Sequence, residues 1–301
     1  SSSEGNAEAF AHSISIEIPL KPMLIADAQV HLWKTDPPDR PLRHGARPFQ
    51  LADLVAEMCA AGVDRAVVIP PFWEGPYNRT ALEAAQLYPD RFRVMGRFEV
   101  SGEPNPAAVG TWREQPGMAG IRLTFHTPEL IRDLGDDALD WFWTAAEKAN
   151  LPLMFYAPGA LATLRKIALR HPSLRIAIDH MGIDRGDTDD AAFAHIEELC
   201  ALGALPNMAV KLTTVPIYSS EPYPHPKLHP YLKRLYDAYG PKRLFWGSDL
   251  TRLPCSYRVC VDLFRNELKW LSVSDLEWIM GRALCDWLGW PLPGDARHAD
   301  R

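Results

Sequence analysis

The sequence predicts an α/β protein built as a (β/α)₈ barrel, and three observations support this fold. Short apolar runs alternate with longer segments of helical periodicity, and eight such runs follow one another along the chain. Each run is almost continuously apolar, as expected for parallel strands that are buried on both faces. No glycine-rich turn follows the first run, which disfavours an open doubly wound sheet with a phosphate-binding loop.

The apolar runs predict the strands, and the segments between them predict the helices. The strands are expected at residues 24–32, 65–71, 91–98, 120–125, 151–157, 174–180, 208–214 and 243–249. The intervening segments place apolar side chains near positions i, i+3 and i+4, and several end in Gly or Asn, as helices do. These helices are expected at residues 53–62, 80–89, 138–150, 161–170, 193–203 and 231–240.

The regular alternation predicts a single barrel domain over residues 23–301, because no linker, repeat or low-complexity tract interrupts it. Residues 1–22 are Ser-rich at first and are expected to form an N-terminal extension. The end of this extension, ISIEIPLKP at residues 14–22, has the pattern of an edge strand or of an arm packed on the outside.

Composition narrows the class of protein. The chain has 301 residues, is 47% hydrophobic and carries a formal net charge of -6. Its Lys and Arg residues are scattered, which argues against a nucleic-acid partner, and no apolar stretch approaches the roughly 18 residues that span a bilayer. The 5 cysteines form no CxxC pair. Reduced thiols and the absence of an apolar leader segment predict a cytoplasmic protein.

Polar side chains stand at or just beyond the ends of most of the predicted strands. Active sites of (β/α)₈ barrels are built at these carboxyl ends. Residues two apart on a strand point to the same side, so Gln29 and His31 are expected to face one cavity. A single such residue is more often part of the core or a cap, but together they predict a convergent site. The residues are Asp27, Gln29, His31, Arg122, Thr124, His126, Tyr156, Asp179, His180, Lys211, Thr213 and Asp249.

Four strand-end motifs resemble the amidohydrolase superfamily. They are DAQVHLW, AIDHMG, VKLTT and LFWGSDL, and the resemblance extends over residues 22–290. The chain is most similar to the amidohydrolase-related branch that contains 2-pyrone-4,6-dicarboxylate lactonase and related lactone hydrolases, and more distantly to metal-dependent decarboxylases. The resemblance implies a hydrolase that opens a lactone, or cleaves a related activated carbonyl, in a small anionic substrate of the kind met in aromatic compound catabolism.

The same resemblance bears on metal binding. The family pattern on the first strand is DxHxH, and here Gln29 replaces its first histidine while His31 matches the second. The family's histidine on the fifth strand is replaced by Tyr156. An amide oxygen is a poor substitute for imidazole, so we expect no metal cofactor. If a single Zn²⁺ or Mn²⁺ is bound, the implied ligands are His31, His180 and Asp249.

The predicted mechanism assigns a role to each group. Asp249 is the general base that activates water, and His180, His31 and Gln29 polarise the carbonyl oxygen. Arg122 is predicted to bind the substrate's carboxylate through its planar fork, and Tyr156 to donate a hydrogen bond to the substrate. Lys211 is expected either to reach the substrate or to pair with a neighbouring acid, Asp179 or Asp249.

Further residues are predicted to line or support the pocket. Asp27 is expected to hold a histidine or the backbone in place. Trp73 and Arg252 follow strand ends and are candidate substrate-binding residues, as is His126; Arg97 and Arg185 are weaker candidates. The loops at 34–50 and 214–230 are Pro-rich and are expected to shape the pocket.

Other functions remain open at this stage. A metal-dependent non-oxidative decarboxylase of an aromatic or muconate-type acid would chelate its substrate on one ion held by His31, His180 and Asp249. A mononuclear metal-dependent hydrolase would use the same ligands, and a barrel that only binds a small molecule would show no turnover. The expected partner is a small anionic substrate, and homo-oligomerisation is compatible with this fold.

Overall fold

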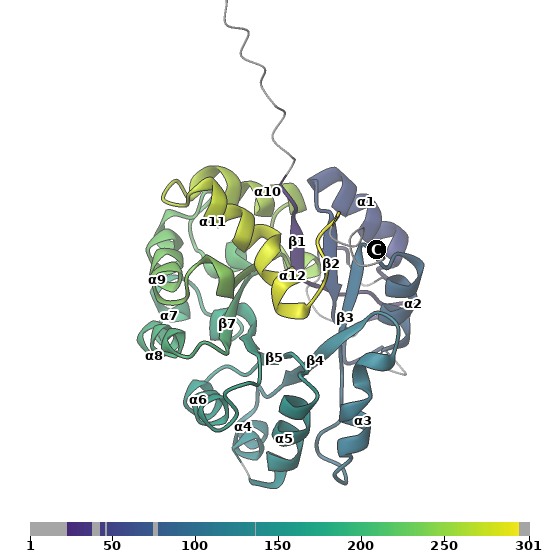
Figure 1. The fold of residues 1–301 in the computed structure, drawn as a ribbon. Coiled ribbons are helices and arrows are strands. Elements are labelled where there is room, and N and C mark those ends of the chain that lie inside the picture. Colours follow the sequence, from purple (N-terminus) through teal and green to yellow (C-terminus); the bar gives the residue numbers. More distant parts are fainter. Residues whose placement is uncertain (1–22, 38–42, 46, 75–77, 136, 295–301) are drawn as a thin grey trace, which may run out of the picture.

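The fold is known from a computed structural model that describes residues 23–37, 43–45, 47–74, 78–135 and 137–294. Eight parallel strands form one sheet in which the neighbours follow chain order from β1 to β8 (Figure 1). They are β1 Ala26–Val30, β2 Arg65–Val68, β3 Phe92–Gly96, β4 Met118–Thr124, β5 Leu153–Tyr156, β6 Ile176–Ile178, β7 Met208–Thr213 and β8 Leu244–Gly247. Each lies within or overlaps a predicted run, which confirms the (β/α)₈ barrel. The expected extension at 1–22 lies outside the described residues.

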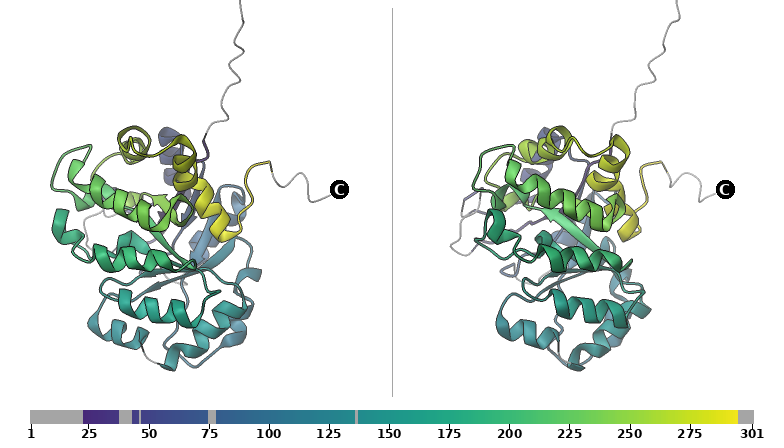
Figure 2. Two further views of the ribbon diagram at one scale, coloured as in Figure 1. Left: turned by 60° about the vertical axis from the view of Figure 1, so that its left-hand side comes forward. Right: turned by 90° about the vertical axis from the view of Figure 1, so that its left-hand side faces the viewer.

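Helices cover the outside of the strands (Figures 1 and 2). They are α1 Leu51–Ala61, α2 Arg79–Leu87, α3 Pro106–Gly110, α4 Pro128–Leu134, α5 Asp140–Lys148, α6 Leu161–Arg170, α7 Asp189–Ala192, α8 Ile196–Ala201, α9 His229–Tyr239, α10 Tyr257–Asp262, α11 Val273–Glu277 and α12 Ala283–Leu288. The helix expected at 193–203 starts only at Ile196, because Phe193 leaves the helical conformation and stacks on Tyr231 with ring centroids 4.3 Å apart. No helix in the described part of the chain is long and apolar enough to cross a membrane.

The last and first strands meet through a side chain as well as through the backbone. The Asp249 N–H donates to the Gln29 carbonyl at 2.9 Å. One residue earlier, the Ser248 N–H donates to Oδ1 of Asp27 at 2.9 Å, and the Ser248 hydroxyl donates to Oδ2. The Tyr257 hydroxyl donates to the same carboxylate at 2.6 Å, and the Gln29 N–H is its fourth donor at 2.8 Å. Asp27 therefore fastens β8 and α10 to β1, a structural role of the kind expected for it.

Glycine is required at position 247 for this junction to close. A Cβ atom there would lie 2.5 Å from Cγ2 of Thr213 and 2.9 Å from Oδ1 of Asp27. Contacts of this length are repulsive, so any larger residue would push β8 away from its neighbours. The backbone hydrogen bond from Asp249 to Gln29 depends on the same close approach.

The candidate site lies above an apolar layer contributed by alternate strand residues. One buried cluster contains Ala177 on β6, Met154 on β5, Ala209 on β7 and other strand residues, together with α12. Two positions further along the same strands stand polar residues, and the two-residue alternation directs them to the same side. These residues are Asp179, Tyr156 and Lys211. The strands thus contribute apolar core residues at one end and the polar residues of the candidate site at their carboxyl ends.

Candidate active site

A small recess of about 50 Å³ opens at the carboxyl ends of the strands. It brings together most of the residues to which the sequence analysis assigned a catalytic or substrate-binding role. Of the polar residues expected at the strand ends, those that do not line it are Asp27, Thr124, His126, Asp179, Lys211 and Thr213. The lining residues are Gln29, His31, Pro70, Pro71, Phe72, Trp73, Arg97, Arg122, Tyr156, His180, Arg185, Asp249, Thr251 and Arg252. Residues from β1, β4 and β5 thus meet residues from the loops that follow β2, β3, β6 and β8.

Lys211 lies directly behind this recess and has no exposed surface. Its Nζ is 2.8 Å from Oδ1 of Asp179, whose Oδ2 accepts from Nε of Arg122 at 3.0 Å. Of the two roles expected for Lys211, the structure shows the pairing with Asp179. Burial acts to raise the pKa of Asp179, but Lys211 and Arg122 outweigh it and bring that pKa to about 2. The single negative charge of Asp179 is shared by two cations, Lys211 and Arg122. The three side chains together therefore carry a net positive charge beside the recess.

The Lys211 ammonium also fixes the orientation of Gln29, because Nζ donates to the amide oxygen Oε1. A lysine can only donate, so the oxygen of the amide must face it and the NH₂ group must face the other way. On that side lie Nε2 of His180 at 3.3 Å and Nε2 of His31 at 3.4 Å. The two amide hydrogens are therefore placed to donate to the two imidazoles.

Both imidazoles are anchored through their other nitrogen. Nδ1 of His31 lies 2.7 Å from the Ile69 carbonyl oxygen, which can only accept, so Nδ1 carries a hydrogen. Nδ1 of His180 lies 2.7 Å from the Thr213 hydroxyl. Burial lowers the pKa of His180 to about 3 despite the nearby carboxylates, so this ring is neutral at neutral pH. The hydrogen bonds are consistent with two neutral rings whose Nε2 atoms are acceptors.

Asp249 completes the recess. Its Oδ1 lies 3.3 Å from Nε2 of His31, and its Oδ2 lies 3.3 Å from Nη1 of Arg252 and 3.7 Å from Nε2 of His180. Burial favours the neutral acid, but the adjacent Arg252 cation outweighs it and holds the pKa of Asp249 well below its usual range. Oδ1 is buried and receives no hydrogen bond from any described residue. It is an ionised oxygen with capacity to accept a proton.

The backbone at this end of the barrel is strained. Asp249, His180 and Thr214 adopt left-handed conformations with φ angles of 49°, 52° and 62°. Such conformations cost non-glycine residues about 1–3 kcal/mol each and are concentrated at functional sites. Here they turn the chain sharply after β6, β7 and β8, and two of the three residues, His180 and Asp249, line the recess.

The remaining predicted residues form a cationic wall beside the recess. The guanidinium carbons of Arg122 and Arg185 lie 5.6 and 5.7 Å from the centre of the Tyr156 ring. His126 packs against the same ring with centroids 6.2 Å apart and lines an adjoining cavity instead of the recess. Burial, aided by Arg185 and Arg122, lowers the pKa of His126.

Two residues near the site escaped the sequence analysis. The Tyr156 hydroxyl donates to Oδ1 of Asp184 at 3.5 Å, and Thr251 lines the recess beside Arg252. Asp184 follows the AIDHMG motif and Thr251 follows LFWGSDL, so their place in the loops after β6 and β8 was the available signal.

The predicted metal ligands lie together, but they are not arranged for an ion. No three His, Cys, Asp or Glu side chains of the described residues form a group suited to metal ligation. The Gln29 NH₂ faces the Nε2 atoms of His31 and His180, whose lone pairs an ion would need, while Lys211 holds the amide oxygen away. An N–H group does not ligate a metal. The residues as they lie therefore do not fit a metal ion.

Comparison with known proteins finds two curated relatives that are named as lactone hydrolases. An L-fucono-1,5-lactonase of Burkholderia ambifaria is 28% identical over 240 residues, which covers 74% of this chain and 79% of the relative. A 4-sulfomuconolactone hydrolase of Hydrogenophaga intermedia is 27% identical over 227 residues, which covers 72% of this chain and 67% of the relative.

An amidohydrolase from Burkholderia multivorans, solved with bound zinc, shares the fold with a TM-score of 0.78 at 20% identity, covering 89% of this chain and 100% of that chain. The zinc belongs to that structure, and it gives no support to our expectation that no metal is bound here. The model of one family, described as Amidohydrolase, matches residues 26–301. This match covers most of the sequence and agrees with the resemblance of the strand-end motifs. The chain therefore belongs to the amidohydrolase family.

Proposed function

We propose that this protein is a hydrolase that opens a lactone in a small anionic substrate, with Asp249 as the base that activates water. The observation that carries the proposal is the buried Oδ1 of Asp249, which is ionised and receives no hydrogen bond from the described residues. The names of the two curated relatives support the same reaction class. We take residues 23–301 as the catalytic barrel.

The first step is attack of water on the lactone carbonyl. A water molecule beside Oδ1 of Asp249 gives its proton to the carboxylate as its oxygen bonds to the carbonyl carbon. A carboxylate with so low a pKa is a weak base and holds a proton poorly. Nε2 of His31, 3.3 Å from Oδ1, is the acceptor to which this proton passes, and it gives up its long 3.4 Å contact with the Gln29 amide when it is protonated.

The negative charge that develops on the carbonyl oxygen needs hydrogen-bond donors. Because the Nε2 atoms of His31 and His180 already accept from Gln29, we assign this role to Arg252 and Tyr156 instead of the imidazoles and Gln29. Burial raises the pKa of Tyr156, so its hydroxyl keeps its hydrogen, and this hydrogen turns from Asp184, 3.5 Å away, to the carbonyl oxygen of the substrate. Donors fixed before the reaction stabilise the tetrahedral intermediate without reorganisation.

Ring opening completes the reaction. The carbon–oxygen bond of the ring breaks, and the leaving alkoxide takes the proton that His31 has received. The products are an alcohol and a carboxylic acid, which then releases its proton to the solvent and becomes a carboxylate. Gln29 and Lys211 act on this step through position: they fix where Nε2 of His31 points. Arg122 and Arg185 bind the anionic group of the substrate beside the Tyr156 ring.

The metal-dependent alternatives make a different demand on the same residues. A single Zn²⁺ or Mn²⁺ held by His31, His180 and Asp249 would require the Gln29 amide to turn away from both Nε2 atoms, against its hydrogen bond from Lys211. A metal-dependent hydrolase or decarboxylase is therefore the interpretation to adopt if activity follows metal content.

The proposal is tested with a γ-butyrolactone that bears one ring carboxylate, with acid release followed by a pH indicator. Wild-type protein should hydrolyse this lactone in proportion to protein concentration. Carbon dioxide release from a hydroxybenzoate, without any lactone hydrolysis, would overturn the proposal in favour of the decarboxylase.

A further inference from the structure

The catalytic recess is too small to hold a substrate. Its volume of about 50 Å³ accommodates one or two water molecules, each of which occupies roughly 30 Å³. The reacting carbonyl and the attacking water fill it, so the rest of any substrate must lie outside. The adjoining cavity has a volume of about 790 Å³, within the range of roughly 300–1,000 Å³ typical of ligand pockets.

The two cavities share a wall. Phe72, Arg97, Arg122, Tyr156 and Arg185 line both of them. A molecule whose carbonyl sits beside Asp249 therefore passes these side chains on its way into the larger space. Three of the five are arginines, so the anionic group of the substrate belongs at this junction.

Beyond the junction the larger cavity is mainly apolar. Its walls come from the segment after β3, from β4 and the loop that follows it, and from the turn before α5, and they include Phe98, Val100, Leu123, Phe125, Leu130, Leu139 and Trp141. The aromatic part is braced from behind, because Phe98 and Trp141 both pack on Phe142, with ring centroids 5.5 and 5.7 Å away. Aromatic side chains that are held in place by packing in this way form a wall against which a flat, apolar group of a substrate can pack.

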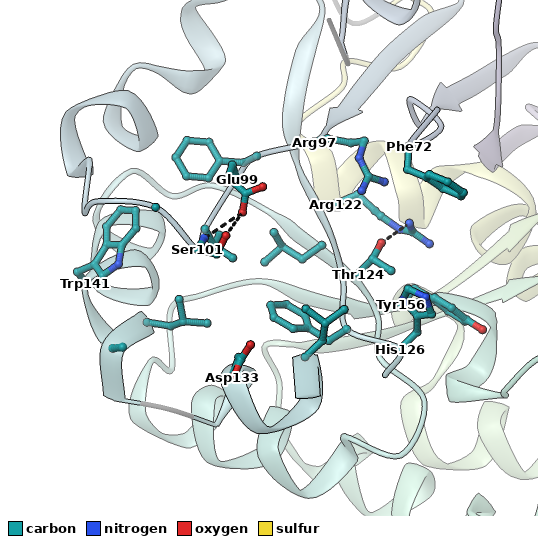
Figure 3. A pocket seen from close by; sticks show the side chains of 18 of the residues that line it. Phe72, Arg97, Glu99, Ser101, Arg122, Thr124, His126, Asp133, Trp141 and Tyr156 are labelled. Carbon is teal, nitrogen blue, oxygen red and sulfur yellow. Dashed lines mark hydrogen bonds between the residues drawn. The ribbon is translucent and has the colours of Figure 1, made fainter. Parts of the chain in front are cut away.

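The charges of the cavity differ between its two ends. Figure 3 shows Arg97 and Arg122 on one side, and Glu99, Ser101 and Trp141 on the other. Glu99 accepts from the Ser101 N–H at 3.0 Å and from its hydroxyl at 2.6 Å, which lowers the pKa of Glu99 and keeps it ionised. Asp133 is a second carboxylate on the lining away from the arginines. Carboxylates there would repel a second anionic group on the substrate.

We propose that the substrate is an anionic lactone that also carries a neutral, apolar substituent about the size of an aromatic ring. The anionic group lies against Arg97, Arg122 and Arg185, and the substituent occupies the 790 Å³ cavity between Phe98 and Leu139. This inference rests on the proposed lactone hydrolysis and narrows its substrate class. Lactones with a second anionic group at the far end are excluded by Glu99 and Asp133.

The test compares the carboxylated γ-butyrolactone with the same lactone bearing a phenyl group on the ring. The phenyl compound should have a kcat/KM about 10- to 100-fold higher, the effect of burying one ring. Ala138 is exposed and lines the cavity, so Ala138→Trp should occupy part of this space and reduce the preference for the phenyl compound. Ala52→Trp, at an exposed position on α1, is the matched control and should leave both rates unchanged.

A charge reversal tests the far end independently. A carboxyphenyl lactone should be a poor substrate of the wild type, and Asp133→Lys should raise its kcat/KM at least fivefold relative to that of the unsubstituted lactone.

The outcomes separate this inference from the proposed function. Equal rates for the first two lactones, with no effect of Ala138→Trp, would overturn the inference and leave lactone hydrolysis standing. If neither lactone is hydrolysed, the proposed reaction is wrong, and calorimetry measures how tightly the two hydroxy-acid products bind. Tighter binding of the phenyl product would still support the cavity as the site of the substituent. Equal binding of the two products would overturn the inference as well as the proposed function.

Discussion

At the scale of single residues, the site depends on which atoms donate and which accept. Lys211 can only donate, so Gln29 must turn its NH₂ toward the imidazoles, and this leaves the Nε2 atoms of His31 and His180 as acceptors. One buried cation thereby influences the hydrogen-bonding pattern of two imidazole rings that it does not touch. Oδ1 of Asp249 is the buried oxygen that this network leaves without a donor among the described residues.

Replacing this carboxylate tests its role directly. We expect Asp249→Asn to lower kcat on a carboxylated lactone by about 10²- to 10⁴-fold, the usual contribution of a general base, with little change in KM. The pKa of Asp249 lies far below neutrality, so wild-type activity should show no loss from protonation of Asp249 between pH 5 and pH 8. Steady-state kinetics across this range check both points.

The matched control is Asp190→Asn, which changes an exposed carboxylate on α7 and should leave kcat unaltered. An Asp249→Asn variant that kept more than a tenth of wild-type kcat would rule out the proposed base.

At the scale of secondary-structure elements, two buried polar groups hold the strands in register. Asp27 accepts hydrogen bonds from the backbone and hydroxyl of Ser248 and from Tyr257, and so connects β1 with β8 and α10. Lys211 on β7 connects to Asp179 after β6 and to Gln29 on β1. Each group is costly to remove because its partners remain buried without a replacement.

Two substitutions at Asp27 should differ in their cost. Asp27→Ala leaves the Ser248 N–H and two hydroxyls without an acceptor, and we expect it to lower the free energy of unfolding by about 3–5 kcal/mol. Asp27→Asn keeps an oxygen for the N–H donors, and its NH₂ can donate to the two hydroxyls, so a loss of about 1–2 kcal/mol is expected. Urea unfolding measures both, and equal losses would contradict the assigned hydrogen bonds.

Removal of the buried cation should be severe. Lys211→Met leaves Asp179 with Arg122 as its remaining ion-pair partner among the described residues, and we expect the free energy of unfolding to fall by about 3–5 kcal/mol. Lys148→Met, at an exposed lysine of α5, should change it by less than about 0.5 kcal/mol. A similar small change in both variants would show that the Lys211 pair contributes little.

At the scale of the whole molecule, the sequence predicted the architecture better than the details of the site. Eight nearly continuous apolar runs predicted the strands because burial on both faces leaves a strong local pattern. Strand-end residues such as His31 and Asp249 could be identified because the barrel brings all carboxyl ends to one face. The orientation of Gln29 could not, since it depends on Lys211, which is far away in sequence. The 790 Å³ cavity was likewise not predicted, because aperiodic loop segments form much of its wall.

The Asp179 pair makes one contribution to the pH dependence of stability. The pKa of Asp179 is about 2 in the folded protein, against 3.8 in the unfolded chain, so the ionised form favours folding. This contribution is fully present above about pH 4 and is lost as the pH falls toward 2; the difference corresponds to about 2 kcal/mol. Urea unfolding at several pH values should show this slope in the wild type and a smaller one in Lys211→Met. Equal slopes would contradict the assignment.

The central claim is lactone hydrolysis by Asp249 with no step through a metal. The most direct measurement is the turnover of a carboxylated lactone by full-length protein after dialysis against a chelator, with the metal content of the same sample determined in parallel. We expect full activity with far less than one metal ion per chain and no stimulation by added Zn²⁺ or Mn²⁺. Activity that disappears with the metal and returns at one ion per chain would contradict the claim and identify His31, His180 and Asp249 as ligands.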